Sequence, residues 1–109
     1  MKHVNYSFTE SDVETCLFAL TKLDSAHDYF DVFGGQAIIN KQCALSAGEK
    51  LASGNLLAPN ELRVLCVCIT FCALVCQDPS VTDLETYQEC MKYIFSLNKL
   101  DEALCSQIM

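Results

Sequence analysis

The stretch that decides the fold of this chain is PNELRVLCVCITFCALVCQ, residues 59–77. Its thirteen residues from Val64 to Cys76 are apolar apart from Thr70. A helix that is apolar on every side cannot lie on a surface with one face in water. The run is also shorter than the roughly 20 residues that a membrane-spanning helix needs. We therefore predict a buried central helix that begins at Pro59, a residue favoured in the first helical turn, and ends near residue 77.

The segment before the central helix has the features of amphipathic helices. Thr9 is typical of an N-cap, because an acidic residue follows three positions later, and we predict a helix from there to about Leu23. Residues 24–36 carry aromatic residues and end in a glycine pair, which favours a loop with some helix. Residues 3–8 alternate apolar and polar side chains and indicate a short extended arm.

Three further helices are predicted along the chain. One covers residues 36–53, with Gly54 as its C-terminal stop. Another opens after the Asp78-Pro79 break with a capping box of Thr82 and Glu85, and a short last helix is predicted to have Asn98 as its cap. The helical period predicts the buried faces of the last two helices. In the helix that follows Asp78-Pro79 the buried residues are expected to be Leu84, Tyr87, Met91 and Ile94. In the last helix they are expected to be Leu100, Leu104 and Ile108.

These elements together predict an all-α fold. Because each outer helix is amphipathic, it can bury one face against the central helix. The expected architecture is an irregular four- to five-helix bundle around the helix at 59–77. A chain of 109 residues has the usual size of one domain, so we expect residues 1–109 to form a single helical domain.

The charge of the chain excludes several classes of partner. It has 14 acidic and 7 basic residues, a net charge of −7. Such a chain is repelled by phosphate backbones and by anionic lipid, so we expect no direct binding to nucleic acid or to a membrane. The first residues lack the apolar region of a signal peptide, and we expect a cytoplasmic protein with reduced thiols.

The eight cysteines are the most unusual part of the composition. Cys68, Cys72 and Cys76 recur every four residues on one helical stripe, with Cys66 beside them. A straight stripe does not offer zinc a tetrahedron of four ligands. The repeated C-x-x-x-C spacing resembles the pattern of copper-storage four-helix bundles, and this resemblance implies a copper(I)–thiolate site as one alternative. We expect instead that these cysteines pack in the core and that the protein holds no metal or cofactor.

No catalytic motif stands out in the sequence. The two histidines, His3 and His27, are expected to be solvated, and a cysteine in an apolar helix lacks the positive surroundings that activate a thiol. Gly34-Gly35 does not belong to a phosphate-binding pattern. Three acidic residues nearby, Asp24, Asp28 and Asp31, lack the spacing of a calcium loop and are expected to be solvated. We predict that the protein is not an enzyme.

The remaining hypothesis is a protein that acts by binding another protein. Two surfaces are candidates for this contact. The acidic surface consists of Asp78, Asp83, Glu85 and Glu89. The aromatic surface consists of Tyr29, Phe30 and Phe33. Glu89 lies beyond the first helical turn, so we expect its charge to be available to a partner.

The function predicted is that of a small acidic regulatory or inhibitory protein, whose partner has a basic groove. A more specific alternative is a phage or mobile-element inhibitor that covers the groove of a host nucleic-acid-binding machine, as some anti-CRISPR proteins do; the analogy rests on size and acidity. We also predict a homodimer, in which a second copy covers either the outer aromatic loop or the part of the central helix's apolar perimeter that its neighbours are expected to leave open.

Overall fold

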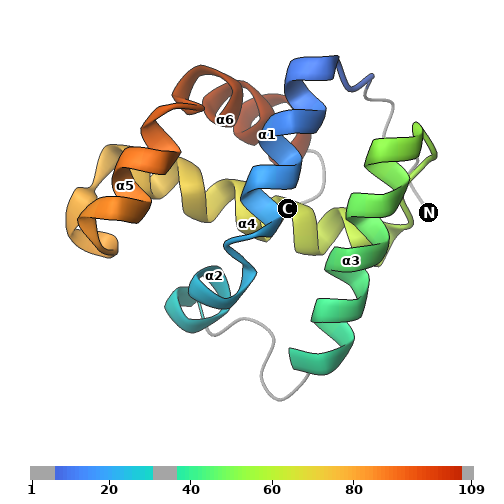
Figure 1. Cartoon of the computed structure of the whole chain (residues 1–109), viewed down its shortest axis with the longest axis horizontal. Helices are drawn as coiled ribbons and strands as arrows, with labels where there is room; N and C mark the ends of the chain where they lie inside the picture. Colours follow the sequence, from blue (N-terminus) through green and yellow to red (C-terminus); the bar gives the residue numbers. More distant parts are fainter. Residues whose placement is uncertain (1–6, 31–36, 107–109) are drawn as a thin grey trace.

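The computed structural model describes residues 7–30 and 37–106, with the backbone alone at 37–39. Within these ranges the chain is helical and contains no strand, which confirms the all-α prediction (Figure 1). The helices are α1 (Glu10–Leu20), α2 (Leu23–Phe30), α3 (Ala37–Ser53), α4 (Pro59–Gln77), the 3-10 turn η1 (Pro79–Val81), α5 (Leu84–Met91), α6 (Ile94–Leu100) and the π-helical segment η2 (Asp101–Cys105).

The helix α4 is the centre of the molecule, as its sequence predicts. It crosses the whole fold in Figure 1, and α1, α2, α3, α5 and α6 all pack against it. Every residue from Val64 to Ile69 is buried, as are Phe71, Cys72, Val75 and Cys76. By length and composition α4 is also the one described helix that could cross a membrane, but two thirds of it (67%) is buried inside the fold.

The burial of α4 bears on the predicted homodimer. We expected the neighbouring helices to leave part of its apolar perimeter uncovered, and this expectation is wrong. Of the residues between Val64 and Cys76, only Thr70 and Leu74 are even half-exposed. The chain therefore covers its own central helix, and a second copy is not needed for that purpose.

The first helix begins where the sequence predicts but ends earlier. Thr9 and Asp12 form a reciprocal capping box, in which the Asp12 N–H donates to Thr9 Oγ1 at 3.1 Å and the Thr9 N–H donates to Asp12 Oδ2 at 3.0 Å. The helix stops at Leu20, three residues before the predicted end, because Thr21 and Lys22 form a turn. The chain then enters α2, so most of the predicted loop is helical. The predicted arm at 3–8 lies largely outside the described residues.

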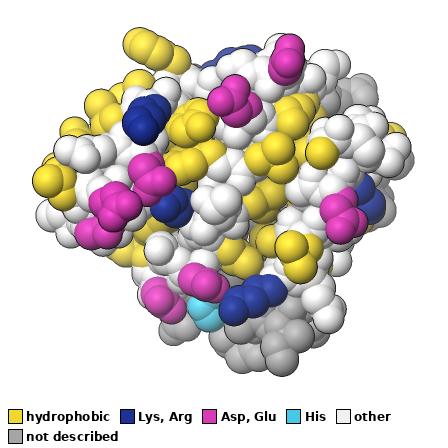
Figure 2. Space-filling view, viewed as in Figure 1, with side chains coloured by type: hydrophobic (Ala, Val, Ile, Leu, Met, Phe, Trp, Pro, Cys, Tyr) yellow, Lys and Arg dark blue, Asp and Glu magenta, His cyan; other side chains and the backbone are white. Residues whose placement is uncertain are grey.

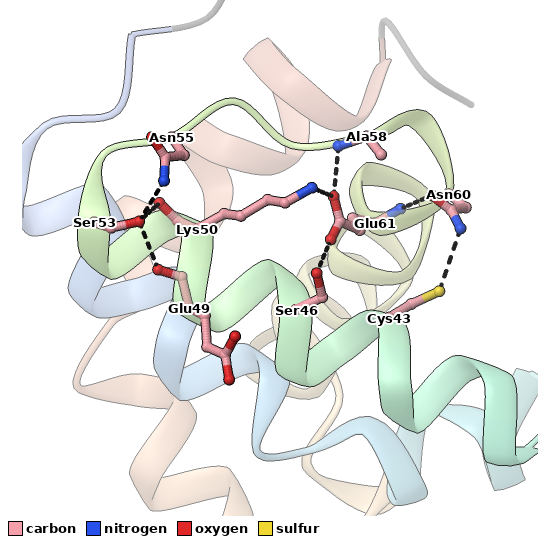
Figure 3. A network of polar contacts seen from close by, with 9 residues as sticks. All are labelled: Cys43, Ser46, Glu49, Lys50, Ser53, Asn55, Ala58, Asn60 and Glu61. Carbon is pink, nitrogen blue, oxygen red and sulfur yellow. Dashed lines mark hydrogen bonds and ion pairs between the residues drawn. The ribbon is translucent and has the colours of Figure 1, made fainter.

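The connection between α3 and α4 is held by a network around a buried carboxylate (Figure 3). Gly54 ends α3 with a φ of 77°, the left-handed conformation that favours glycine. Glu61, in the first turn of α4, accepts hydrogen bonds from the Ala58 N–H at 2.6 Å, from Lys50 Nζ at 2.7 Å and from the Ser46 hydroxyl. One side chain thus joins the last turns of α3 to the start of α4.

The C-terminal helices differ from the prediction in their caps and in one buried face. The N-cap of α5 is Asp83, not Thr82, because its carboxylate accepts from the Thr86 N–H at 3.1 Å. Asn98 lies inside α6 and caps nothing. Leu84, predicted to be buried, is 67% exposed, and the buried residues of α5 are instead Thr86 and Cys90.

The last predicted buried face is partly confirmed. Leu100 and Leu104 are fully buried, whereas Ile108 lies outside the described residues. Tyr87, Met91 and Ile94 are half-buried against the core.

Candidate functional site

The four acidic residues predicted to bind a partner lie together on η1 and α5. We call this stretch, residues 78–89, the acidic segment; it contains four carboxylates and no lysine or arginine. Asp78, Asp83 and Glu85 are exposed, and Glu89 is half-exposed. Figure 2 shows acidic side chains gathered over this side of the molecule. The structure therefore brings the acidic residues together on one surface.

Two of these carboxylates also have structural roles. Asp78 caps η1, accepting from the Ser80 N–H at 3.1 Å and from the Ser80 hydroxyl at 2.6 Å, and these bonds lower its pKa. The hydrogen bonds from Thr86 lower the pKa of Asp83 in the same way. Both side chains consequently stay ionised while they hold the backbone of the segment in place.

Glu89 is not an available charge, contrary to our expectation. Its Oε1 lies 3.0 Å from Lys22 Nζ, which belongs to the turn between α1 and α2. Lys22 also lies over the Phe18 ring, 5.7 Å from its centre. The sequence does not show this pair, because 67 positions separate its members. Glu85 is thus the exposed carboxylate of the acidic segment that neither caps a helix nor pairs with Lys22.

An exposed leucine lies between the acidic side chains. Leu84 occupies the first position of α5, directly between Asp83 and Glu85, and 67% of it is exposed. An exposed apolar side chain whose neighbours in sequence are acidic is a candidate for a small apolar contact within a polar surface. Sequence reasoning missed it, because the helical period assigned Leu84 to the core.

The predicted aromatic surface is separate from the acidic segment. Tyr29 and Phe30 are the last residues of α2, and their rings meet edge to face at 5.0 Å. Both pack against Phe71 in the middle of α4, at 5.9 and 6.3 Å. Tyr29 is 49% exposed and Phe30 is half-buried. The third predicted member, Phe33, lies outside the described residues. These rings mainly pack α2 on α4.

A polar pocket lies between α2 and α3. It is lined by Leu23, Asp24, His27, Asp28, Asn40 and Lys41. Lys41 lies 3.7 Å from Asp24, and both side chains are exposed. Asp24 and Asp28 are exposed, as predicted, whereas His27 is half-buried rather than fully solvated. Asp31 lies outside the described residues.

The thiols form contacts that the sequence pattern does not reveal. Within the described ranges all eight cysteines are free, and all but Cys43 are buried. Two of the α4 cysteines lie near cysteines of other helices: Cys72 and Cys90 of α5 act on each other's pKa, and the Cys105 thiol of η2 donates to the Cys66 carbonyl at 3.7 Å. Each contact joins positions far apart in the sequence. The α4 stripe predicted one half of each pair.

The two thiol pairs differ in their electrostatic surroundings. The neighbouring Cys72 thiol and the Lys22 ammonium lower the pKa of Cys90, and together they outweigh burial and the Glu89 carboxylate, which raise it. For Cys66, the contact with Cys105, burial and the Asp101 carboxylate all raise the pKa. Burial and the Asp12 carboxylate raise the pKa of the adjacent Cys16 to about 12. The first pair therefore lies beside the Lys22–Glu89 ion pair, and the second lies beside carboxylates without a lysine among the groups that act on it.

A metal site does not follow from this arrangement. In the parts of the chain that the structure describes, no three histidine, cysteine or acidic side chains converge closely enough to hold a metal ion. The predicted stripe places its thiols along a helix, and the pairs that it forms with other helices are separate. Neither pair offers a third ligand.

Comparison of the chain with models of protein families, with curated proteins and with solved structures finds no match.

Proposed function

We propose that the protein is a small acidic regulatory protein that binds a basic surface of another protein through its acidic segment. The observation that carries the proposal is Leu84, an exposed leucine that lies between Asp83 and Glu85 in the sequence at the start of a helix. Apolar contact supplies affinity at the centre of such a surface, and the surrounding charge selects the partner and steers its approach.

The acidic segment is held in a fixed shape, which favours binding. Asp78 and Asp83 fix the backbone of η1 and the first turn of α5 by capping, and the Lys22–Glu89 pair fixes the other end of α5. A surface that is ordered before it binds loses less conformational entropy on association. The partner surface of matching chemistry is basic and has an apolar recess for Leu84. A basic groove, such as one that holds nucleic acid, has this chemistry.

Two substitutions test the proposal without disturbing the structural carboxylates. Leu84→Gln combined with Glu85→Lys removes the apolar contact and reverses one exposed charge. Its matched control is Leu45→Gln with Glu49→Lys on α3, where Leu45 is 70% exposed and Glu49 is exposed. Both variants change the net charge equally, so a general effect of charge acts on both.

The assay is capture from an extract of the native cells with the immobilised full chain, at low and at high salt, with quantification of the retained proteins. We expect at least one protein that the wild type and the α3 control retain at low salt, that the α5 variant loses, and whose binding weakens as salt is raised. Retention that is equal for both variants, or that does not respond to salt, would contradict the proposal. So would the absence of any retained protein.

A further inference from the structure

The pocket between α2 and α3 lies on other helices than the acidic segment and encloses about 320 Å³. Small-molecule pockets in proteins begin at roughly this size. Both helices pack on α4, which holds the two walls of the pocket in position. Three of the residues that line it, Asp24, Asp28 and Lys41, are exposed, so the pocket opens to solvent. A small molecule therefore has both room and access.

One polar side chain in the wall of this pocket lacks the hydrogen bond that its burial calls for. Asn40 is 8% exposed, and within the described part of the chain its amide nitrogen Nδ2 has no acceptor. A buried amide donor without a partner destabilises a fold, and most such donors in proteins are paired. The amide of asparagine turns easily about its last side-chain torsion, so Nδ2 needs little movement to reach an acceptor that enters the pocket. A ligand with an oxygen acceptor supplies what Asn40 lacks.

The charged and polar groups of the pocket are divided between its two walls. The α2 wall carries the carboxylates of Asp24 and Asp28, and the α3 wall carries two donors, the Asn40 amide and the Lys41 ammonium. Figure 2 shows acidic side chains on one side of the histidine of α2 and a basic side chain on the other. The Lys41–Asp24 ion pair across the pocket is long, at 3.7 Å, and exposed. Such a pair contributes little free energy, so it can exchange for contacts with a ligand.

We propose that this pocket binds a neutral α-amino acid with an apolar side chain, its carboxylate on Asn40 and Lys41 and its ammonium on Asp28. The carboxylate offers acceptors to Nδ2 and to the Lys41 ammonium, and hydrogen bonds to a charged group are stronger than those between neutral groups. The ammonium offsets the surplus negative charge of the lining, which has two carboxylates and one lysine. The buried Leu23 offers an apolar contact to the side chain of the ligand.

Other small ligands match this lining less well. An inorganic anion such as phosphate would meet two carboxylates. An amine or a metal cation would bind the carboxylates but offer no acceptor to Asn40, and within the described ranges no three metal-binding side chains converge. A molecule that carries both charges matches both walls.

The test is an NMR titration of the isotope-labelled full chain with L-alanine, L-valine and L-leucine. The side-chain amide signal of Asn40 reports directly on its hydrogen bond and is assigned by its loss in Asn40→Leu. We expect at least one of the three amino acids to shift this signal in a saturable manner. The amine and the carboxylic acid of the same carbon skeleton are then titrated separately. Each is expected to bind about tenfold more weakly or worse, because each lacks one charged contact.

Two variants test the two walls of the pocket, with binding followed through the backbone signals of α2 and α3. Asn40→Leu keeps the branched shape of the side chain without its donor and is expected to bind no amino acid. Asp28→Asn removes the carboxylate that receives the ammonium and is expected to bind about tenfold more weakly. The matched controls are Asn98→Leu in α6 and Glu49→Gln in α3, which lie outside the lining and are expected to bind as the wild type.

The proposal is overturned if none of the three amino acids shifts the Asn40 amide signal of the wild type, a result that needs no variant. It is also overturned if the amine or the carboxylic acid binds as tightly as the amino acid, or if a folded Asn40→Leu variant binds as the wild type does. The backbone spectrum of each variant without ligand establishes that it is folded before its binding is compared.

Discussion

Replacement of Glu61 is the substitution whose effect follows most directly from the structure. The Glu61 side chain is 5% exposed and accepts from Lys50, Ser46 and the Ala58 N–H, which together join α3 to α4 (Figure 3). Burial raises its pKa, but the bonds from Lys50, Ser46 and Ala58 outweigh burial, so the pKa is lowered from its ordinary value of 4.5. The carboxylate is therefore ionised in the folded chain.

The size of the expected loss of stability follows from the three hydrogen-bond donors to Glu61. A hydrogen bond to a charged group contributes roughly 1.5 to 3 kcal/mol. Lys50 is 36% exposed and regains water when its partner is removed, so its share is reduced. We expect Glu61→Ala to lower the free energy of unfolding by about 3 kcal/mol, and Glu61→Gln, which keeps the shape and one acceptor oxygen, by about 1 kcal/mol. Urea unfolding at pH 7 measures both, with Glu49→Gln on the exposed side of α3 as the control.

The pH dependence of the free energy of unfolding is a second test of the role of Glu61. A carboxylate whose folded pKa is lowered contributes stability above its unfolded pKa, and that contribution disappears as the pH falls through the folded value. The difference in stability between the wild type and Glu61→Gln should therefore be constant above about pH 5 and shrink below pH 4.5. A difference that stays constant to pH 3, or a Glu61→Ala variant as stable as the wild type, would refute the reasoning.

Four further substitutions probe the helix ends, the middle of α3 and the core. Thr9→Ala removes the cap of α1 and should lower the free energy of unfolding by about 1 kcal/mol in thermal or urea unfolding, whereas an unchanged value would show that the capping box is dispensable. Gly48→Ala should stabilise the protein by about 0.5 to 1 kcal/mol, because alanine favours a helix and the new Cβ meets Leu17 Cδ2 at an ordinary 3.6 Å. Gly54→Ala should destabilise it by about 1 kcal/mol, because φ is 77° at that position. Equal effects of the two substitutions would contradict the left-handed conformation of Gly54. Cys72→Ala should lower the free energy of unfolding by about 1 to 2 kcal/mol, and an unchanged value would contradict the burial of its sulfur.

The parts of the fold that the sequence predicts are those governed by local rules. The central helix follows from an apolar run between Pro59 and Asp78-Pro79, and the start of α1 follows from Thr9 and Asp12. Gly54 ends α3 because only a residue without a side chain adopts its φ at no cost. In each case the decisive contacts lie within four residues along the chain.

The sequence-based predictions are wrong where contacts between residues far apart in the sequence determine the structure. Helical period alone assigns Leu84 to the core, but Asp83 takes the N-cap and the first position of α5 then faces water. Glu89 meets Lys22 across 67 positions, and the turn at Thr21 and Lys22 that makes this possible has no strong sequence signal. Local rules also do not bring Cys105 to the Cys66 carbonyl, because this contact depends on how η2 packs on α4.

The candidate site is likewise predicted in part. The acidic residues are exposed or half-exposed, as their hydrophilic character predicts, and they are close in sequence. Tyr29 and Phe30 pack on Phe71, a contact that their positions in the sequence do not predict. Leu84 is the residue of the candidate site that only the structure identifies.

The central claim, that the acidic segment docks on a basic protein surface, is tested most directly by the association rate of the captured partner. The rate is measured for the wild type and for Glu85→Lys at two salt concentrations. Charges that steer an encounter raise the association rate, and salt screens them. We predict a slower association for Glu85→Lys and a shallower dependence on salt, with the Glu49→Lys control close to the wild type. Identical rates and identical salt dependence for Glu85→Lys and the wild type would contradict the account.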